Sequence, residues 1–336
     1  MSKQFSEIEI RYLSDIQEFL KGFIDSLYSA PYEALHDIFS YHLGLDDPLE
    51  KQGKRIRPIL VLISAVGAGI SAFKAMPAAA AIELVHNFSL IHDDIEDNGE
   101  YRRGKLAVWK KWGLAQGLNA GDAMYNAAFI SLERLVNHFS CETQQQAINL
   151  LSQTCNKLTK GQYLDIYYEE RSTISIDAYL EMISGKTAAL LACSVEMGAL
   201  LAGLDQTQRA LYREFGKKLG LGFQIYDDWL GIWGDADLTG KSTISDLIER
   251  KRSYPILLGL QKSEVFRKQF LNCTIDPELA SDLAEELRNV GVEEEVKAFC
   301  AKWTNEALVT LEKMACAEEQ KKHLRAIANK LLLRSR

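Results

Sequence analysis

The sequence predicts an all-α protein, a single-domain helical bundle around a central cavity, and three observations carry this prediction. Proline is scarce, with 6 residues in 336, and the apolar stretches are long and rich in Ala and Leu, a composition that favours helices over sheet. Apolar residues recur at helical spacing along most of the chain, whereas strand-like alternation of useful length is not found. No low-complexity linker interrupts the chain, so we interpret residues 1–336 as one domain.

The individual helices are expected from this periodicity and from residues that start or stop helices. Arg57-Pro58 predicts one helix start, and Pro77 predicts the start of a long helix that reaches Asp97 and ends at Asn98-Gly99. The remaining helices are expected over about 5–28, 119–139, 143–168, 176–203, 207–233 and 253–262. Shorter amphipathic helices are expected after Pro277.

Charge and hydropathy narrow the possible functions. The formal net charge is −7, and an acidic chain argues against a nucleic-acid partner, which needs a basic face. The longest nearly apolar run, Ala188 to Leu204, contains Glu196 and falls short of the roughly 20 residues of a membrane span. The six cysteines form no Cys-x-x-Cys pair, and the first residues do not resemble a signal peptide. We therefore expect a cytoplasmic protein without a transmembrane segment.

Four carboxylates occupy five consecutive positions of a mostly apolar helix: Asp93, Asp94, Glu96 and Asp97. Aspartate is a poor helix former, like charges at i and i+4 repel, and a helix C-terminus disfavours negative charge. One interpretation is a solvated, acidic helix end. The other is a metal site, because Asp93 and Asp97 lie about 40° apart on the face that also carries His86. Mg²⁺ prefers one or two carboxylates together with phosphate oxygens and water.

A second pair of adjacent acids, Asp227 and Asp228, lies in another apolar helix after Gln224. Basic residues occur near both acidic clusters, and each alone would be an ordinary surface charge: Lys54, Arg57, Arg102, Arg103, Lys186 (followed by Thr187), Lys241 and Lys251. Together the acidic and basic groups predict a cavity for diphosphates, with metal ions on one side and Lys/Arg on the other. Walker and Gly-x-Gly-x-x-Gly signatures do not occur, so we expect no nucleotide-type phosphate loop.

Several of these motifs, in this order, resemble those of the trans-isoprenyl (polyprenyl) diphosphate synthase family, short-chain type. Gly53 to Pro58 is similar to the family's GKRxRP motif. His92 to Asp97, with Arg102-Arg103-Gly104 after it, resembles the first aspartate-rich motif and its trailing arginines. Phe223 to Asp228, followed by Gly234-Asp235, resembles the second. The likeness covers about residues 50–262.

The second motif departs from the family's usual Asp-Asp-x-x-Asp pattern, because Gly231 stands at its fifth position. Asp235 lies eight residues after Asp227, too far along the helix to replace that carboxylate. Asp227 itself is retained. We expect activity to survive this change.

The resemblance implies the isoprenoid synthase fold and a Mg²⁺-dependent prenyltransferase, in which three ions assist ionisation of an allylic diphosphate (dimethylallyl, geranyl or farnesyl) before head-to-tail condensation with isopentenyl diphosphate. It also implies a homodimer. Isopentenyl diphosphate would be held by Lys54, Arg57, His86 and Arg103. The allylic diphosphate would be held through Mg²⁺ by Asp93, Asp97 and Asp227, with Asp94 and Asp228 in support. Its direct contacts would come from Arg102, Lys186, Thr187, Gln224, Lys241 and Lys251.

By the same resemblance, product length is expected to depend on the floor under the growing chain, which would be formed by Phe88 and Ser89, five and four residues before Asp93 and roughly 7 Å down the helix axis. By resemblance, an aromatic followed by a small residue at these positions is similar to synthases that make geranylgeranyl diphosphate, with farnesyl diphosphate next. The alternative is that Phe88 is simply a core residue.

Three other functions remain open. A terpene cyclase on the same fold would ionise an allylic diphosphate without condensing it, and retention of Lys54, Arg57, His86 and Arg103 argues against that interpretation. A non-catalytic subunit of a heteromeric synthase would be expected to lose aspartates from the first motif, which this chain keeps. The third is a plain helical scaffold or binding module.

Overall fold

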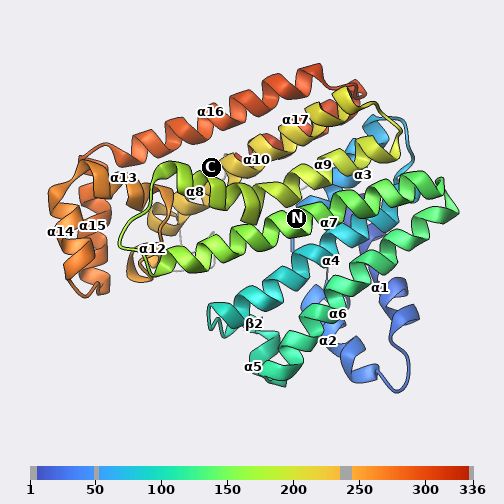
Figure 1. The fold of residues 1–336 in the computed structure, drawn as a ribbon, viewed down its shortest axis with the longest axis horizontal. Helices are drawn as coiled ribbons and strands as arrows, with labels where there is room; N and C mark the ends of the chain where they lie inside the picture. Colours follow the sequence, from blue (N-terminus) through green and yellow to red (C-terminus); the bar gives the residue numbers. More distant parts are fainter. Residues whose placement is uncertain (1–5, 49–52, 235–243, 333–336) are drawn as a thin grey trace. The chain divides into compact units, whose positions relative to one another are not determined.

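The computed structural model describes residues 6–48, 53–234 and 244–332, and most of them lie in helices (Figure 1). This confirms the predicted all-α class. Among the described residues the only strands are two short ones, β1 (Tyr101–Arg102) and β2 (Lys105–Leu106), which pair antiparallel as a hairpin. The chain divides into two compact units. The interpretation of residues 1–336 as one domain stays a prediction.

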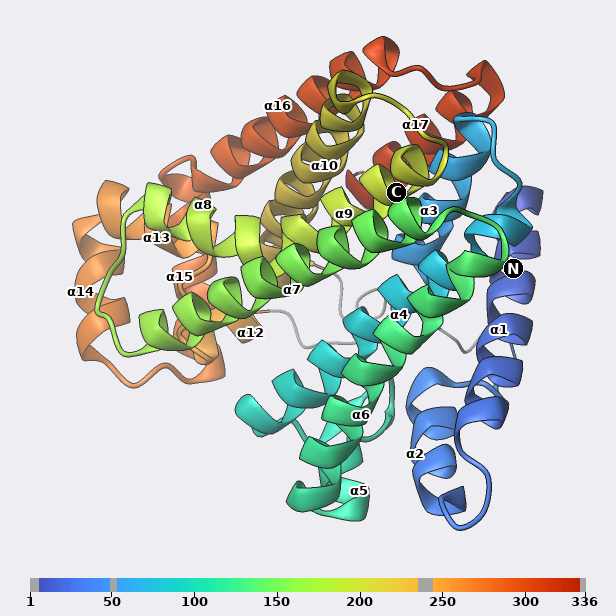
Figure 2. The same ribbon diagram turned by 45° about the vertical axis from the view of Figure 1, so that its right-hand side comes forward.

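The first unit comprises residues 1–153, 193–209 and 315–320. Its complete helices are α1 (Glu7–Leu27), α2 (Glu33–Leu43), α3 (Ile56–Gly67), α4 (Ala72–Glu96), α5 (Val108–Trp112), α6 (Leu114–Glu133) and the 3₁₀ turn η2 (Arg134–Asn137). α1 starts at a capping box, in which Ser6 and Glu9 bond each other's backbone N–H, an arrangement that satisfies two orphan donors. Figures 1 and 2 both show α4 running alongside α6.

Small residues allow the close approach of α4 and α6. A Cβ at Gly117 would lie 2.9 Å from Trp109 Cβ and 3.1 Å from Ile95 Cδ1, and a Cβ at Gly121 would run into the ring of His92. The Ser131 hydroxyl donates to the Pro77 carbonyl at 2.8 Å. α4 therefore has a fixed position in the first unit, and the acidic residues at its end have one too.

The second unit comprises residues 154–192, 210–314 and 321–336. Its complete elements are α8 (Ile176–Ile183), the π-helical turn η3 (Ser184–Ala188), α12 (Ser245–Ile248), α13 (Tyr254–Lys262), α14 (Glu264–Asn272), α15 (Pro277–Asn289) and α16 (Val292–Lys313). Four helices contribute residues to both units: α7 (Cys141–Glu169), α9 (Ala189–Leu201), α10 (Gln206–Trp233) and α17 (Glu318–Leu332).

The structure corrects the predictions for the helix at Pro77 and the helix over 176–203, and α6 begins at Leu114 rather than at about 119. α4 begins at Ala72, so Pro77 lies inside the helix and does not open it; Ala75 and Met76 are buried there, and their packing outweighs the local preference for a start at proline. The helix expected over 176–203 is interrupted by the π-helical turn at Ser184–Ala188. There Gly185 and Gly161 of α7 approach so closely that a Cβ at Gly185 would lie 2.9 Å from Gly161 Cα. A backbone contact with α7 thus accompanies the π turn.

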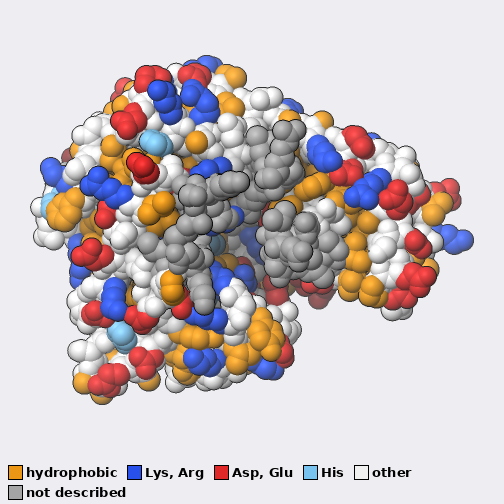
Figure 3. All heavy atoms as spheres, turned by 180° about the vertical axis from the view of Figure 1, so that it is seen from behind, with side chains coloured by type: hydrophobic (Ala, Val, Ile, Leu, Met, Phe, Trp, Pro, Cys, Tyr) orange, Lys and Arg blue, Asp and Glu red, His pale blue; other side chains and the backbone are white. Residues whose placement is uncertain are grey.

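Two surface features bear on function. No helix of the described ranges is both long and apolar enough to cross a bilayer. On the face shown in Figure 3, Lys and Arg side chains are interspersed with Asp and Glu, in keeping with the net charge of −7.

Candidate active site

The first aspartate cluster ends α4, and its acids differ in exposure. Asp93 is half-buried and Asp97, which caps the helix, is exposed, whereas Asp94 is only 2% exposed. Arg102 donates to Asp94 Oδ1 from Nη2 at 2.5 Å and from Nε at 2.9 Å. Burial raises the pKa of Asp94, and the bond from Arg102 opposes that rise. Asp94 is therefore buried and paired with an arginine, while Asp93 and Asp97 are more accessible.

The hairpin after α4 positions the two arginines. Its two-residue loop consists of Arg103 (φ 54°) and Gly104 (φ 74°), and positive φ at both loop positions is typical of a type I′ turn. Arg103 incurs a conformational cost in this region that glycine does not. The tight turn places Arg102 against Asp94. The Arg103 side chain is exposed, but the protein packed around its guanidinium still lowers the pKa of that group.

Arg57, His86 and Arg103 form a basic cluster in the first unit. Arg57 Nη1 lies 3.1 Å from His86 Nε2, and because a guanidinium only donates, His86 accepts there and carries its proton on Nδ1. Burial, followed by the charges of Arg57 and Arg103, holds the pKa of His86 well below its ordinary value. Burial also lowers the pKa of Arg57 to about 10. A neutral histidine and two guanidinium groups favour an anion at this place.

The loop before α3 lies against this cluster. A Cβ at Gly53 would be 3.0 Å from Arg103 Cζ, so the loop passes close to the guanidinium. Lys54 follows immediately and is exposed. Lys54 and Arg57 are three residues apart, a spacing that would put them on one side of a helix that included both. α3 begins only at Ile56, after Arg55 in a left-handed conformation, so helical spacing does not relate the two.

Three buried residues beside this cluster were not predicted from the sequence. Arg55 Nη2 donates to the Leu43 carbonyl at 3.0 Å, and its Nε lies 3.9 Å from Glu83 Oε1. Burial, and then the charges of Arg103 and Arg102, lower the pKa of His42 to about 3. Glu83 is thus the buried counter-charge of a basic cluster that gathers residues from α2, α3, α4 and the hairpin. The only signal in the sequence was a single Glu inside a run of apolar residues.

The second aspartate pair, on α10, shows the same division of exposure. Asp227 is exposed and Asp228 is 6% exposed. Asp228 Oδ2 accepts from the Tyr179 hydroxyl at 2.6 Å and from the Tyr254 backbone N–H at 2.9 Å, and Oδ1 accepts from the Gln224 amide at 2.9 Å. Burial, with the negative charge of Asp246 added, raises the pKa of Asp228 to about 7, although these bonds oppose the rise.

Gln224 joins the buried acid to the π-helical turn. The Thr187 hydroxyl donates to Gln224 Oε1 at 2.7 Å, and the neighbouring Lys186 pairs with Asp165 of α7. Asp165, Tyr179 and Tyr254 were not predicted, because each contacts the motif only through the fold. The structure thus brings Thr187, Gln224 and Asp228 together. π-helical turns occur frequently at functional sites.

Of the last two predicted lysines, the structure describes only Lys251. Lys251 follows α12, is exposed, and its Nζ lies 2.9 Å from Glu249 Oε2. Lys241, like Asp235, lies outside the described residues.

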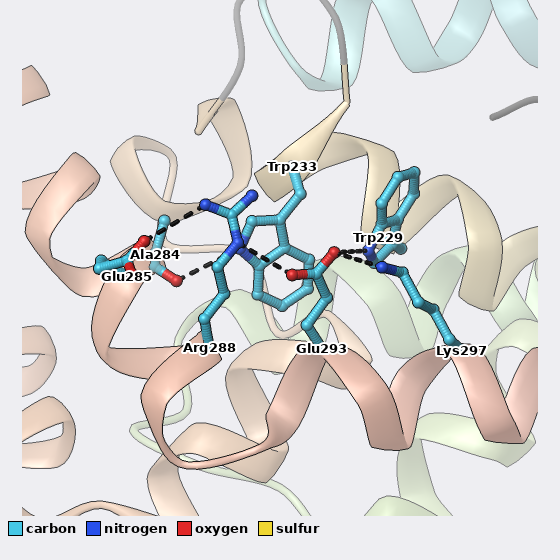
Figure 4. A network of polar contacts seen from close by, with 7 residues as sticks. All are labelled: Trp229, Trp233, Ala284, Glu285, Arg288, Glu293 and Lys297. Atoms are coloured by element: carbon cyan, nitrogen blue, oxygen red, sulfur yellow. Dashed lines mark hydrogen bonds and ion pairs between the residues drawn. The ribbon is translucent and has the colours of Figure 1, made fainter. Parts of the chain in front are cut away.

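The C-terminal half of α10 is anchored by α15 and α16, as Figure 4 shows. Trp229 Nε1 donates to Glu293 Oε1 at 3.2 Å, and Trp233 Nε1 donates to the Ala284 carbonyl at 3.2 Å. Glu293 also contacts Lys297 Nζ at 2.6 Å and Arg288 Nε at 2.9 Å. Burial opposes ionisation of Glu293, but the bonds from Lys297 and Arg288 outweigh it and lower its pKa. The helix that carries Asp227 and Asp228 is therefore fixed within its unit.

Phe88 lies on α4, half-buried, in a row of aromatic rings. Its ring centroid is 5.0 Å from that of Tyr125 on α6 and 5.8 Å from that of His92, both edge to face. Tyr125 in turn contacts Phe129 at 5.2 Å. The Ser89 hydroxyl donates to the His86 carbonyl at 2.8 Å. Tyr125 and Phe129 were not predicted, because the sequence does not show that α6 packs against this face of α4.

The carboxylates of both clusters fit a hard cation such as Mg²⁺, since they offer oxygen ligands only. Asp94 Oδ2 is buried and has no hydrogen-bond partner among the described residues. Within those residues, no three His, Cys, Asp or Glu side chains converge as a ready-made metal cage. Mg²⁺ usually binds through one or two carboxylates plus substrate phosphates and water, so the donor set fits the ion as part of a diphosphate complex.

Known proteins resemble this chain along most of its length. A family model described as "Polyprenyl synthetase" matches residues 42–289. A (2E,6E)-farnesyl diphosphate synthase of Mycobacterium tuberculosis is 42% identical over 229 residues, which are 66% of this chain and 62% of that protein. A geranylgeranyl diphosphate synthase of Saccharolobus solfataricus is 33% identical over 275 residues, 82% of this chain and 79% of that protein. The chain spans about 62% of the length of the farnesyl diphosphate synthases it matches.

Solved structures agree with these matches. A crystal structure of a geranylgeranyl pyrophosphate synthase superimposes with a TM-score of 0.88 at 31% identity, covering 98% of this chain and 99% of the other. A geranylgeranyl pyrophosphate synthase from Corynebacterium glutamicum, complexed with isoprenyl diphosphate and magnesium, has a TM-score of 0.84 at 26% identity, covering 96% and 99%. On the family match, the motifs and the fold, the chain belongs to the polyprenyl synthetase family.

Proposed function

We propose that this protein is a Mg²⁺-dependent prenyltransferase that condenses isopentenyl diphosphate with an allylic diphosphate to a short-chain prenyl diphosphate. The basic cluster of Arg57, His86 and Arg103 carries the proposal. An enzyme that only ionises an allylic diphosphate has no second diphosphate to hold, so it gains nothing from this cluster. Relatives named farnesyl and geranylgeranyl diphosphate synthase support the proposal.

Isopentenyl diphosphate is assigned to Lys54 and the basic cluster. Guanidinium groups make paired, charge-assisted hydrogen bonds to phosphate oxygens, and Arg57 and Arg103 supply two of them. Neutral His86 adds no charge of its own, and it orients Arg57 through the bond at 3.1 Å. Glu83 offsets part of the positive charge, since its carboxylate opposes the lowering of the pKa of Arg57. The basic side chains can therefore be held close together before substrate binds.

The allylic diphosphate is assigned to Asp93, Asp97 and Asp227 through Mg²⁺, with three ions expected. When bound, the metal supplies Lewis-acid stabilisation of the leaving diphosphate and a template that orients it. Asp94 and Asp228 support their accessible neighbours from buried positions. Direct contacts are assigned to Arg102, Lys186, Thr187, Gln224, Lys241 and Lys251. The magnesium complex of the Corynebacterium glutamicum synthase supports this metal.

We propose geranylgeranyl diphosphate as the product, because Phe88 precedes Asp93 by five residues and is only half-buried, against Tyr125. Farnesyl diphosphate is the second candidate, favoured by the 42% identity to a farnesyl diphosphate synthase. The assembly into a homodimer and the cytoplasmic location stay predictions.

Phe88→Ala should lengthen the product by at least one isoprene unit, because it removes a bulky ring from the proposed floor. Chromatography of the dephosphorylated products measures this directly. Phe129→Ala, in the same aromatic row but one ring farther from Phe88, is the matched variant and should shift the products less. An unchanged product spectrum for Phe88→Ala would contradict the floor and leave Phe88 as a core residue.

Incubation of the pure protein with Mg²⁺, radiolabelled isopentenyl diphosphate and each allylic primer tests the function itself. We expect label in a prenyl diphosphate, and loss of product when Mg²⁺ is chelated. Hydrocarbon formed from the primer without incorporation of label would indicate a terpene cyclase. No turnover with any primer would indicate a non-catalytic subunit.

A further inference from the structure

Position 231 is the one place where the second motif departs from the usual pattern, and the structure shows what surrounds it. Gly231 lies on α10 four residues after Asp227, so a side chain there would start one turn along the helix, about 40° from Asp227. The family's third aspartate would stand at this place. The space that its Cβ would need is occupied.

The carboxyl group of Asp246 fills that space. A Cβ at position 231 would lie 2.5 Å from Asp246 Cγ and 2.6 Å from each of its carboxylate oxygens. These separations are far inside van der Waals contact, so any side chain at position 231 would displace the Asp246 carboxylate. Asp246 is 8% exposed. Both residues belong to the second unit.

The backbone before Asp246 is shaped to bring this carboxylate in. Ile244 caps α12 with φ 65°, a left-handed conformation that a β-branched residue adopts only when its surroundings impose it. α12 then spans only Ser245–Ile248, and the Lys251 N–H closes the turn by donating to the Asp246 carbonyl at 3.0 Å. A strained residue and a short helix thus hold Asp246 against the bare backbone of Gly231.

We propose that Asp246 supplies, from α12, the carboxylate that position 231 lacks, and acts as a positioning residue for the Mg²⁺–diphosphate complex at Asp227. Gly231 and Asp246 form a reciprocal pair, in which the missing side chain of one makes room for the carboxylate of the other. The inference rests on the proposed function, because it concerns the same metal-bound diphosphate. A purely structural alternative exists, in which Asp246 only fixes α12 to α10.

The experiment exchanges the carboxylate between the two positions. Asp246→Asn, Gly231→Asp and the double variant Gly231→Asp/Asp246→Gly are compared with the wild type. Two quantities are measured: the Mg²⁺ concentration for half-maximal thermal stabilisation by inorganic diphosphate, and the Mg²⁺ concentration for half-maximal condensation. Loss of a group that supports a metal ligand typically costs 10–100-fold in metal affinity. We expect about a tenfold rise in both for Asp246→Asn and for Gly231→Asp, and recovery to within about threefold of wild type in the double variant.

Gly231→Ala separates the proposal from the structural alternative, because it keeps every carboxylate. Helix propensity alone predicts a slightly higher melting temperature for this variant. The proposal predicts a severalfold higher Mg²⁺ requirement, since the new methyl group pushes the Asp246 carboxylate away. This variant also decides the question if Asp246→Asn fails to fold. Asp282→Asn, an exposed acid-to-amide change on α15, is the control and should leave both quantities unchanged.

The outcomes separate the two proposals. The role of Asp246 would be overturned if the double variant needed as much Mg²⁺ as the worse single variant, or if Gly231→Ala left the Mg²⁺ requirement unchanged. In either case, condensation by the wild type would still uphold the proposed function. A wild type that neither condenses its substrates nor gains stability from Mg²⁺ and diphosphate would overturn the proposed function itself. Far-ultraviolet circular dichroism without Mg²⁺ confirms that each compared variant is folded.

Discussion

The two aspartate pairs of this protein stabilise a buried carboxylate in two different ways. Both place one acid where a ligand can reach it, Asp93 or Asp227, and bury the next, Asp94 or Asp228. Asp94 is compensated by a charge, the guanidinium of Arg102. Asp228 is compensated by neutral donors, and a second carboxylate, that of Asp246, adds to the rise in its pKa.

This difference follows from where each pair lies. Asp94 is near the end of α4, so the hairpin that follows can return an arginine to it eight residues later. Asp228 is inside α10, with helix on both sides, and its donors come from α8, α13 and its own preceding turn. The buried acid of the first pair is therefore held by a residue close to it in sequence. The buried acid of the second pair is held mainly by residues that tertiary packing brings to it.

The largest expected effect is on the accessible acids. Asp93→Ala and Asp227→Ala should each lower kcat for condensation by about 10³-fold, since the several kcal/mol that metal ions contribute correspond to such a factor. Both variants should keep the wild-type melting temperature within a few degrees, because Asp227 is exposed and Asp93 is only half-buried. Steady-state kinetics at saturating Mg²⁺ measure this. A large loss of kcat for only one of the two variants would contradict the equivalent roles of Asp93 and Asp227.

Arg102→Ala should be the most destabilising change at the first pair. It leaves the Asp94 carboxylate buried without its charge partner, at a cost of about 3 kcal/mol in the free energy of unfolding. Urea denaturation measures it. Lys110→Ala removes a cation from the surface pair with Glu100 and should cost no more than about 0.5 kcal/mol. Equal losses for both variants would show that burial of Asp94 does not matter.

Tyr179→Phe should have a smaller effect at the second pair. It removes one of three donors to Asp228 while two remain, at a cost of about 1.5 kcal/mol, the upper end of the usual range for one hydrogen bond. Tyr163→Phe, at an exposed tyrosine of α7, is the matched control and should be neutral. A loss as large as that of Arg102→Ala would mean that the neutral donors are not interchangeable.

Glu96→Gln should do least. Glu96 is exposed and lies about 100° round the helix from Asp97, so condensation should stay within about twofold of wild type. Asp97→Asn in the same assay should lose most of the activity. A large effect of Glu96→Gln would extend the metal site beyond the face shared by Asp93 and Asp97.

The sequence predicted the helices and the accessible acids because both depend on short-range spacing. Asp93 and Asp97 share a face by helical geometry alone, and the long runs of α7 and α10 follow from apolar periodicity. It did not predict Glu83, His42 or Tyr179, because each reaches its partner across the fold. The break at Ser184–Ala188 was also missed, since it accompanies the contact of Gly185 with Gly161. Asp246 illustrates the same limit: the gap at Gly231 was visible in sequence, but what fills it was not.

A crystal structure with Mg²⁺, isopentenyl diphosphate and a non-ionisable thio analogue of the allylic diphosphate would show which acid of each pair binds metal. We predict metal–oxygen distances of about 2.0–2.1 Å at Asp93, Asp97 and Asp227, and no metal contact at Asp94 or Asp228. We also predict that the phosphates of isopentenyl diphosphate lie against Arg57 and Arg103. Metal bound to the buried acids, or isopentenyl diphosphate bound away from the basic cluster, would refute the division of roles between accessible and buried acids.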